Sequence, residues 1–195
     1  MNILKRVKQI LFSPASFFSS IEKEKGIKNT FIYLSIILII PTLLSPLKLL
    51  YVQKETFDLL AQNIQLSTTQ AVILFMVAGY VISLFFSFVT AFILFVWLKM
   101  FKGKHPFDQA YKLIVYSNTP SYLTSWIPFI GGFSFIYSFI LLIIGTKQIY
   151  KFSSLKATLL YLIPTIIILV LLLILVLVAY LSLASLQSFT IPPGF

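Results

Sequence analysis

Long apolar segments alternate with short polar ones along most of this chain, and the alternation predicts membrane-spanning helices. A helix needs about 20 mostly apolar residues to cross the hydrocarbon core of a bilayer. The fold class that we expect is therefore all-α, a polytopic integral membrane protein with a single five-helix membrane domain over residues 27–186. Its five transmembrane helices are predicted at about residues 27–47, 71–98, 110–127, 129–146 and 157–186.

The segment before the first span, residues 1–26, has a different pattern. Ile3, Val7 and Ile10 recur at helical spacing, with basic residues on the opposite side, which is typical of an amphipathic helix. Ser13 followed by Pro14 predicts the start of a second short helix. We expect this segment to form amphipathic interfacial helices on the cytoplasmic side.

Two features refine the first two spans. Pro41 predicts a bend in the first span, because proline disrupts the helix before it. Ser67 and Gln70 have the spacing of a capping box, which predicts the start of the second helix. Small residues then recur every fourth position and predict a helix-packing ridge, formed by Gly79, Ser83, Ser87 and Ala91.

The third predicted span is unusually polar for a segment that crosses hydrocarbon. Lipid cannot satisfy free carbonyls or a side-chain amide, so this face must point into protein or a wet cavity. It is interpreted either as packing against neighbouring helices or as a path for lipid headgroups or a small solute. The candidate polar intramembrane face comprises Ser117, Asn118, Thr119, Pro120, Thr124 and Ser125.

Composition and charge support the membrane class and give an orientation. Hydrophobic residues make up 59% of the chain, above the roughly 45 to 50% of soluble domains. With five spans, all of the 15 basic residues except Lys48 and Lys54 fall on one side. The positive-inside rule then predicts a cytoplasmic N-terminus, and a C-terminus outside with the uncharged tail 187–195.

The basic loops are candidate contacts for anionic lipid headgroups or for a protein partner on the cytoplasmic face. Asp108 and Lys112 stand four residues apart, which predicts either a solvated ion pair or a lysine that holds a phosphate headgroup or the carboxylate of a partner. Nucleic acid is not an expected partner, because the charges are spread over three loops without interleaved aromatics. The candidate lipid or partner contacts are Lys102, Lys104, Lys112, Lys147, Lys151 and Lys156.

No pattern of catalytic residues is present, so we do not expect an enzyme. The chain has no cysteine and only one histidine, and it lacks glycine-rich phosphate and dinucleotide motifs. The acidic residues all lie in loops or interfacial segments, which argues against an ion-coupled transporter. We therefore predict no catalytic residue, no cofactor and no metal site.

Three motifs resemble those of the Yip-domain (Ypt/Rab-interacting) family, specifically its small bacterial and archaeal members. They are LFSPASFFSSI, AYKLIVYSNTP and IGGFSFIYSFILLIIGTKQIYKFSSLKA. The resemblance covers roughly residues 12–165. The resemblance implies five spans and a cytoplasmic N-terminus. Eukaryotic members sit in early secretory and Golgi membranes, bind prenylated Rab GTPases and take part in vesicle traffic. Their longer N-terminal region with an Asp-Leu-Tyr-Gly-Pro motif is absent here, so the resemblance gives no ground for expecting GTPase binding.

The function predicted from the sequence is a non-enzymatic Yip-like interaction or membrane-organising module, in a prokaryotic plasma membrane. The alternative is a channel, transporter or lipid-translocating protein that uses the polar face of the third helix. Both functions are compatible with a homo-oligomer, and the sequence does not predict the number of subunits.

Overall fold

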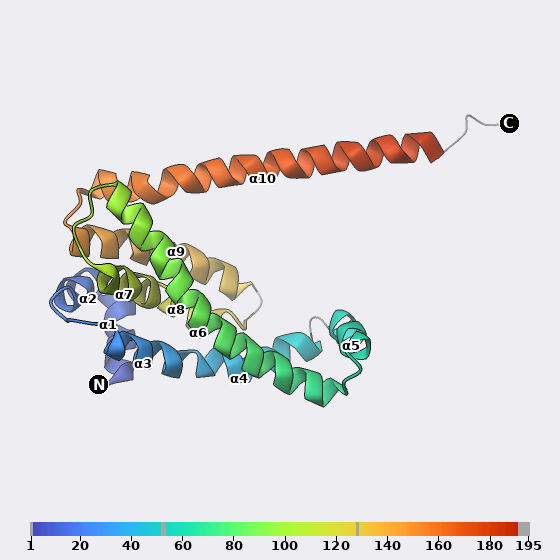
Figure 1. Ribbon diagram of the computed structural model, residues 1–195, viewed down its shortest axis with the longest axis horizontal. Helices are drawn as coiled ribbons and strands as arrows, with labels where there is room; N and C mark the ends of the chain where they lie inside the picture. The colour runs from blue at the N-terminus through green and yellow to red at the C-terminus, as the bar shows by residue number, and fades with distance from the viewer. Residues whose placement is uncertain (1, 52–53, 128, 191–195) are drawn as a thin grey trace. The chain divides into compact units, whose positions relative to one another are not determined.

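The computed structural model describes residues 2–51, 54–127 and 129–190, and over these ranges it contains helices and no strand. The chain is all-α, as predicted (Figure 1). The helices are α1 (Ile3–Phe12), α2 (Pro14–Ile21), α3 (Lys28–Ile37), α4 (Ile39–Tyr51), α5 (Lys54–Asn63), α6 (Thr68–Met100), α7 (Phe107–Ser117), α8 (Thr119–Thr124), α9 (Ile130–Tyr150) and α10 (Ser154–Thr190).

Local sequence signals account for several helix ends. Asn2 caps α1 by accepting a hydrogen bond from the backbone N–H of Lys5 at 3.1 Å, and Pro14 opens α2. The predicted capping box at the start of α6 is confirmed. Ser67 Oγ accepts from the N–H of Gln70, whose side chain accepts from the N–H of Ser67 in return.

The predicted bend in the first span is confirmed, because α3 ends at Ile37 and α4 begins at Ile39. Pro41 explains the position of the break. Its ring clashes with the carbonyl four residues earlier, at Ile37, and it has no N–H to donate to that carbonyl. Pro46 lies inside α4 and does not end the helix, which continues to Tyr51.

Four described stretches of helix are long and apolar enough to cross a membrane: Lys28–Leu47, Thr68–Met100, Ile130–Tyr150 and Ser154–Leu183. They overlap four of the five predicted spans. The remaining predicted span, 110–127, forms the two short helices α7 and α8. The structure therefore supports a polytopic membrane protein.

The chain divides after Phe152 into two units, the first with α1 to α9 and the second with α10. Every side chain of α10 from Ile166 to Leu183 is exposed and nearly all are apolar, as expected for a helix surrounded by lipid. This helix continues to Thr190. The rest of the predicted tail, 191–195, and the side chain of Lys48 lie outside the described residues.

Helix α7 is the centre of the first unit. All of its residues from Gln109 to Ser117 are buried, and it packs against α3, α6 and α9. Tyr111 and Tyr116 supply much of its packing surface: Tyr111 stacks on Phe88 of α6, and Tyr116 meets Phe17 of α2 edge-on. The expectation that protein shields this polar segment is confirmed for α7.

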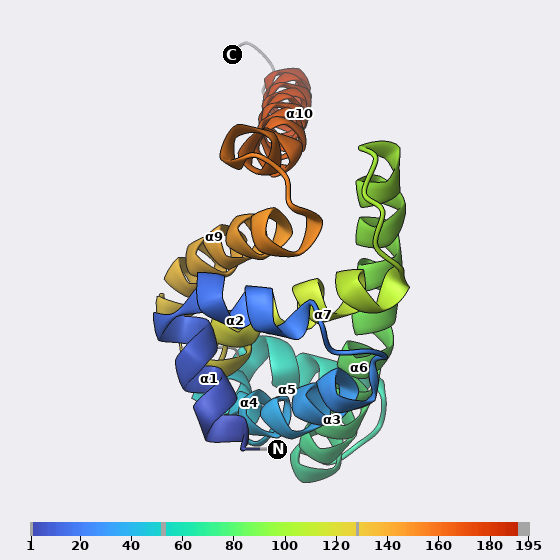
Figure 2. The ribbon, with the colours of Figure 1, turned by 90° about the vertical axis from the view of Figure 1, so that its left-hand side faces the viewer.

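The amphipathic helices α1 and α2 pack on the rest of the first unit, where α2 lies along α9 (Figure 2). Their apolar residues Ile10, Phe17, Phe18 and Ile21 are buried in protein. Leu4 remains 81% exposed and is free to contact lipid. Their predicted place in the membrane interface stays a prediction.

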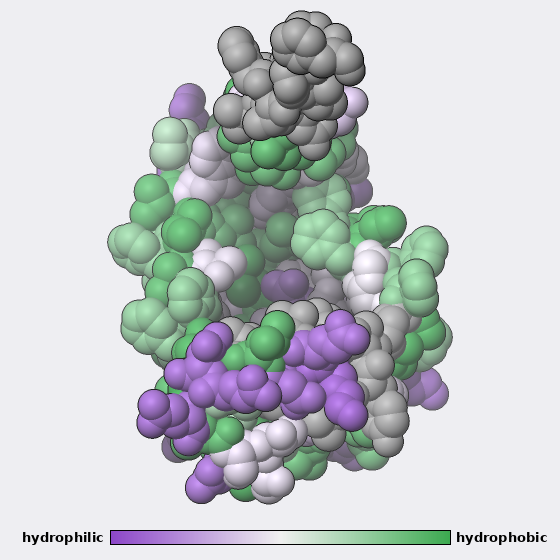
Figure 3. All heavy atoms as spheres, turned by 90° about the vertical axis from the view of Figure 1, so that its right-hand side faces the viewer, coloured by the Kyte–Doolittle hydropathy of each residue, from purple (hydrophilic) through white to green (hydrophobic). Residues whose placement is uncertain are grey.

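Hydrophilic residues gather over α5, which lies between α4 and α6 in the chain (Figure 3). The exposed ones include Lys54, Glu55, Gln62 and Asn63. A segment this polar is solvated more readily by water than by hydrocarbon. It therefore fits the predicted aqueous loop between the first two spans.

Candidate functional site

The loop between α2 and α3 is bonded to the start of α7 by a buried charge. Lys112 is fully buried, and its ammonium donates to the backbone carbonyl of Glu24 and to Asp108 Oδ2 at 3.2 Å. The same carboxylate oxygen accepts from the N–H of Gly26 at 3.1 Å. Gly26 has a φ of +73°, a conformation that glycine adopts at no steric cost, which lets the loop turn toward Asp108.

Helix α1 joins the same cluster through Arg6. One guanidinium nitrogen donates to Glu24 Oε1 at 2.8 Å, and the other donates to the hydroxyl of Tyr116 at 2.5 Å. Thr30 of α3 also donates to that hydroxyl, at 3.3 Å. Tyr116 thereby links α1, α3 and α7 in the interior of the unit.

The loop has two further partners. Gln109 of α7 donates to the carbonyl of Glu22 at 2.9 Å, and Lys151, just after α9, pairs with the Glu22 carboxylate at 2.6 Å. Residues 22–26 are therefore held by α1, by α7 and by the end of α9. We call this set of contacts the loop clamp.

The loop between α6 and α7 meets the end of α9. A Cβ at Gly103 would lie 2.8 Å from the carbonyl oxygen of Leu98 and 3.0 Å from the ring of Tyr150, so only glycine fits without displacing these groups. The ring of His105 lies edge-on to Tyr150, with centroids 5.1 Å apart. The 101–106 loop thus joins the 22–26 loop and the end of α9 at one end of the unit.

This end of the unit carries an excess of positive charge. Its three acidic residues Glu22, Glu24 and Asp108 are each engaged in an ion pair. We call it the basic end, defined by the exposed lysines Lys23, Lys25, Lys102, Lys104 and Lys147.

The six lysines predicted as lipid or partner contacts occupy different environments. Lys102, Lys104 and Lys147 are exposed at the basic end. Lys112 is fully buried in the loop clamp, which leaves it no surface for a headgroup. Lys151 is exposed but paired with Glu22, and Lys156 is partly buried in the second unit.

The candidate polar face of the third predicted span is largely occupied by bonds within the protein. Thr119 lies 3.0 Å from the hydroxyl of Tyr33, and both are fully buried. Ser117 and Asn118 donate to the carbonyl of Ile114, and Thr124 donates to that of Pro120.

Ser125 and Pro120 complete the predicted set. Pro120 is buried, whereas Ser125 is exposed. Just before α8, helix α7 ends at Ser117, where Pro120 cannot donate to the carbonyl of Tyr116, four residues earlier. Ser121, another polar residue of this segment, lies 2.9 Å from Ser138 Oγ on α9.

The predicted small-residue ridge of α6 divides into two halves. Ser87 and Ala91 are buried, and Ser87 lies 3.4 Å from the hydroxyl of Tyr111 on α7. Gly79 and Ser83 are exposed, and a Cβ at Gly79 would meet nothing within 4 Å.

Several key residues were not singled out from the sequence. Arg6 was assigned only to a charge pattern, and Tyr33 has no local signal because its partner lies 86 residues away. Gly145 allows α9 to approach its neighbours closely, since a Cβ there would lie 2.5 Å from Leu113 and 2.9 Å from the Phe18 ring. Its only signal was its place in the GTKQ motif.

Among the described residues, no group of histidine and acidic side chains has the arrangement of a metal site. The described polar contacts join one part of the protein to another, and the exposed charge is basic. The arrangement can attract acidic groups and can hold helices together.

Helices of this length and hydropathy, around a buried polar segment, define an integral membrane protein of the multi-helix class. A comparison with protein families extends this result: the model of the Yip1 domain matches residues 8–185. The chain belongs to the Yip1 domain family, and the resemblance found in its motifs is confirmed. Comparisons with curated proteins and with solved structures gave no match.

Proposed function

We propose that this protein is a non-enzymatic membrane-organising module whose basic end binds the anionic headgroups of membrane lipids. The observation that carries the proposal is the meeting of two basic loops and the basic last turn of α9, distant in the sequence, at one end of the unit. Their acidic residues are consumed by internal ion pairs, so the exposed lysines have no counter-charge there.

The expected strength of this attraction is modest but cumulative. A basic residue near an anionic membrane surface contributes about 1 kcal/mol. Five exposed lysines at the basic end therefore favour an anionic surface by a few kcal/mol at low salt, and screening at high salt reduces the effect. An acidic protein partner would use the same surface.

The proposed topology has five crossings, with the basic end and the N-terminus in the cytoplasm of a prokaryotic cell and the C-terminus outside. α7 and α8 together run from Phe107 to Thr124, which is about 27 Å of helix at 1.5 Å per residue. That length nearly matches a hydrocarbon core of about 30 Å. With four crossings, Lys147 would fall opposite the N-terminal lysines, against the positive-inside rule.

The test uses the purified full-length protein in vesicles of phosphatidylcholine with or without phosphatidylglycerol. The variant changes Lys102, Lys104 and Lys147 to Gln, which leaves the loop clamp intact. We expect the wild type to retain phosphatidylglycerol through detergent extraction and the variant to retain much less. Equal retention by the two proteins would reject the basic end as a lipid-binding surface.

The alternative of transport along the polar face of the third segment has less support. Thr119 and Ser121 bond to neighbouring helices, while Ser117, Asn118 and Thr124 bond to backbone carbonyls of their own segment. Groups that are already satisfied offer little to a passing solute. We therefore assign these five residues to packing.

A further inference from the structure

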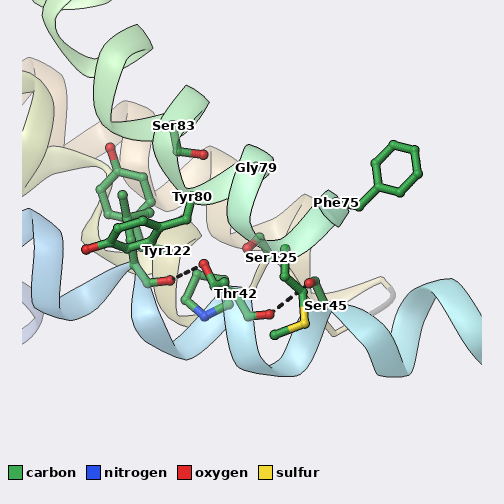
Figure 4. A pocket seen from close by; sticks show the side chains of 11 residues that line it. Thr42, Ser45, Phe75, Gly79, Tyr80, Ser83, Tyr122 and Ser125 are labelled. Atoms are coloured by element: carbon green, nitrogen blue, oxygen red, sulfur yellow. Dashed lines mark hydrogen bonds between the residues drawn. The ribbon is translucent and has the colours of Figure 1, made fainter. Parts of the chain in front are cut away.

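A groove of about 450 Å³ opens in the first unit, apart from the basic end (Figure 4). Its walls come from α4 and Leu38 just before it, from α6, and from the segment at and after α8. We call it the hydroxyl groove, because six of its eleven lining residues carry a hydroxyl. They are Thr42, Ser45, Tyr80, Ser83, Tyr122 and Ser125.

Three of these hydroxyls are satisfied inside the protein. Thr42 donates to the carbonyl of Leu38 and Ser45 to that of Thr42, both on α4. Tyr80 donates across to the carbonyl of Ser35 on α3 at 2.9 Å.

The other three hydroxyls, of Ser83, Tyr122 and Ser125, form no hydrogen bond with any other described residue. They line the same groove, from two different segments of the chain. A polar group without a partner is costly at membrane depth, where water is scarce. A ligand that offers acceptor or donor oxygens would remove this cost.

The position along α6 limits the kind of ligand. This helix is about 50 Å long, so its ends extend beyond a hydrocarbon core of about 30 Å. Its groove residues run from Phe75 to Ser83. They lie in the half of the helix nearer Ser67. This half extends from the edge of the hydrocarbon core to about its middle, so the groove lies within the membrane.

The lining also limits the charge of the ligand. No residue that lines the groove carries a charge, and the remaining walls are apolar or glycine, formed by Leu38, Pro41, Phe75, Met76 and Gly79. A charged headgroup would lose its hydration there without gaining an ion pair. Pockets of this size and mixed lining are typical of small-molecule sites.

We propose that the hydroxyl groove binds a membrane lipid with an uncharged, oxygen-bearing head, of the diacylglycerol type. The hydroxyl and ester oxygens of the lipid would pair with Ser83, Tyr122 and Ser125, and an acyl chain would follow the apolar wall. This site is independent of the proposed lipid binding at the basic end, which uses charge.

Gly79 provides a sharp test, because a larger side chain has open space there and helix propensity favours the change. The full-length protein is placed in phosphatidylcholine vesicles with a photoactivatable diacylglycerol and irradiated, and the labelled peptides are mapped. We expect labels on α4, on the 75–83 stretch of α6 and on residues 119–125, and we expect Gly79→Leu to abolish them. Gly132→Leu is the matched control, since Gly132 also has open space but does not line the groove.

A second variant removes the hydroxyls without filling the space. Ser83→Ala with Tyr122→Phe and Ser125→Ala should lower lipid labelling by about fivefold for each hydrogen bond lost, because one such bond contributes about 1 kcal/mol. Unchanged labelling in both variants would overturn the proposal, as would equal labelling by a photoactivatable phosphatidylglycerol with the same chains. The lysine-to-glutamine variant of the basic end should label like the wild type, so the two proposals fail separately.

Discussion

At the scale of single residues, the loop clamp centres on the buried ammonium of Lys112, which contacts both Glu24 and Asp108. The spacing of Asp108 and Lys112 predicted an ion pair, and the pair is present at 3.2 Å. Its burial was not predictable, because the atoms that cover it come from a loop more than 80 residues earlier. The unpaired lysines at the basic end, by contrast, were visible from charge alone.

The buried ammonium makes the loop clamp sensitive to one substitution. Lys112→Met removes the charged partner of Asp108, which then keeps the N–H of Gly26 as its donor, and the closer of two donors to the Glu24 carbonyl. Breaking a buried pair from one side costs about 3 to 5 kcal/mol. We expect a marked fall in the thermal unfolding midpoint of the protein in detergent. Lys104→Met is the control, because an exposed lysine away from such contacts should change stability by less than about 0.5 kcal/mol. Equal midpoints would show that the clamp contributes nothing to stability.

The contact between Tyr33 and Thr119 tests whether the polar face of the third predicted span serves helix packing or transport. If this pair holds α3 to α8, the double-mutant cycle of Tyr33→Phe and Thr119→Val should give a coupling energy of about 0.6 kcal/mol, the average for such bonds in a membrane protein, and at most about 1.7 kcal/mol. Unfolding in detergent supplies the free energies. A coupling energy near zero would remove this support for the packing assignment. The control is the cycle of Ser45→Ala with Tyr33→Phe, whose effects on the free energy of unfolding should add, because Ser45 donates within α4 instead.

At the scale of helices, local signals predicted starts and bends but not partners. Ser67 and Gln70 predicted the start of α6, and Pro41 predicted the break after α3. The division of residues 110–127 into α7 and α8 was not predicted, although Pro120 was noted within that segment. Nor was the burial of α2, because an amphipathic pattern fits a membrane surface and a protein surface equally well.

Gly145 tests how α2 is held. A leucine there places side-chain atoms where Leu113 and the Phe18 ring now lie, and overpacking of this kind typically costs 1 to 3 kcal/mol. We expect Gly145→Leu to push α2 away from α9 and to speed tryptic cleavage after Lys23 and Lys25. Gly132→Leu, on the same helix with open space around it, should leave cleavage at the wild-type rate. If both variants are cleaved alike, the close approach at Gly145 does not secure α2.

At the scale of the whole molecule, the pattern of charges carries information that helix lengths do not. Four described stretches are long enough to cross a membrane unaided, whereas α7 and α8 are each too short. Burial also removed the cue that a hydropathy pattern relies on, since α7 faces protein on all sides and therefore tolerates polar residues. The chain therefore has five crossings if the connection between α8 and α9 lies outside, and four if it lies in the cytoplasm.

The absence of cysteine makes that connection easy to locate. Phe129, next to the start of α9, is 90% exposed, so protein would not shield Phe129→Cys from a reagent in the aqueous phase that it faces. With five crossings, a membrane-impermeant maleimide added to intact cells labels Phe129→Cys and the outside reference Asn63→Cys, but labels Lys104→Cys only after lysis. With four crossings, Phe129→Cys behaves like Lys104→Cys instead. That result would place Lys147 opposite the N-terminal lysines, divide the positive charge between two compartments and remove the physical basis for a single basic surface.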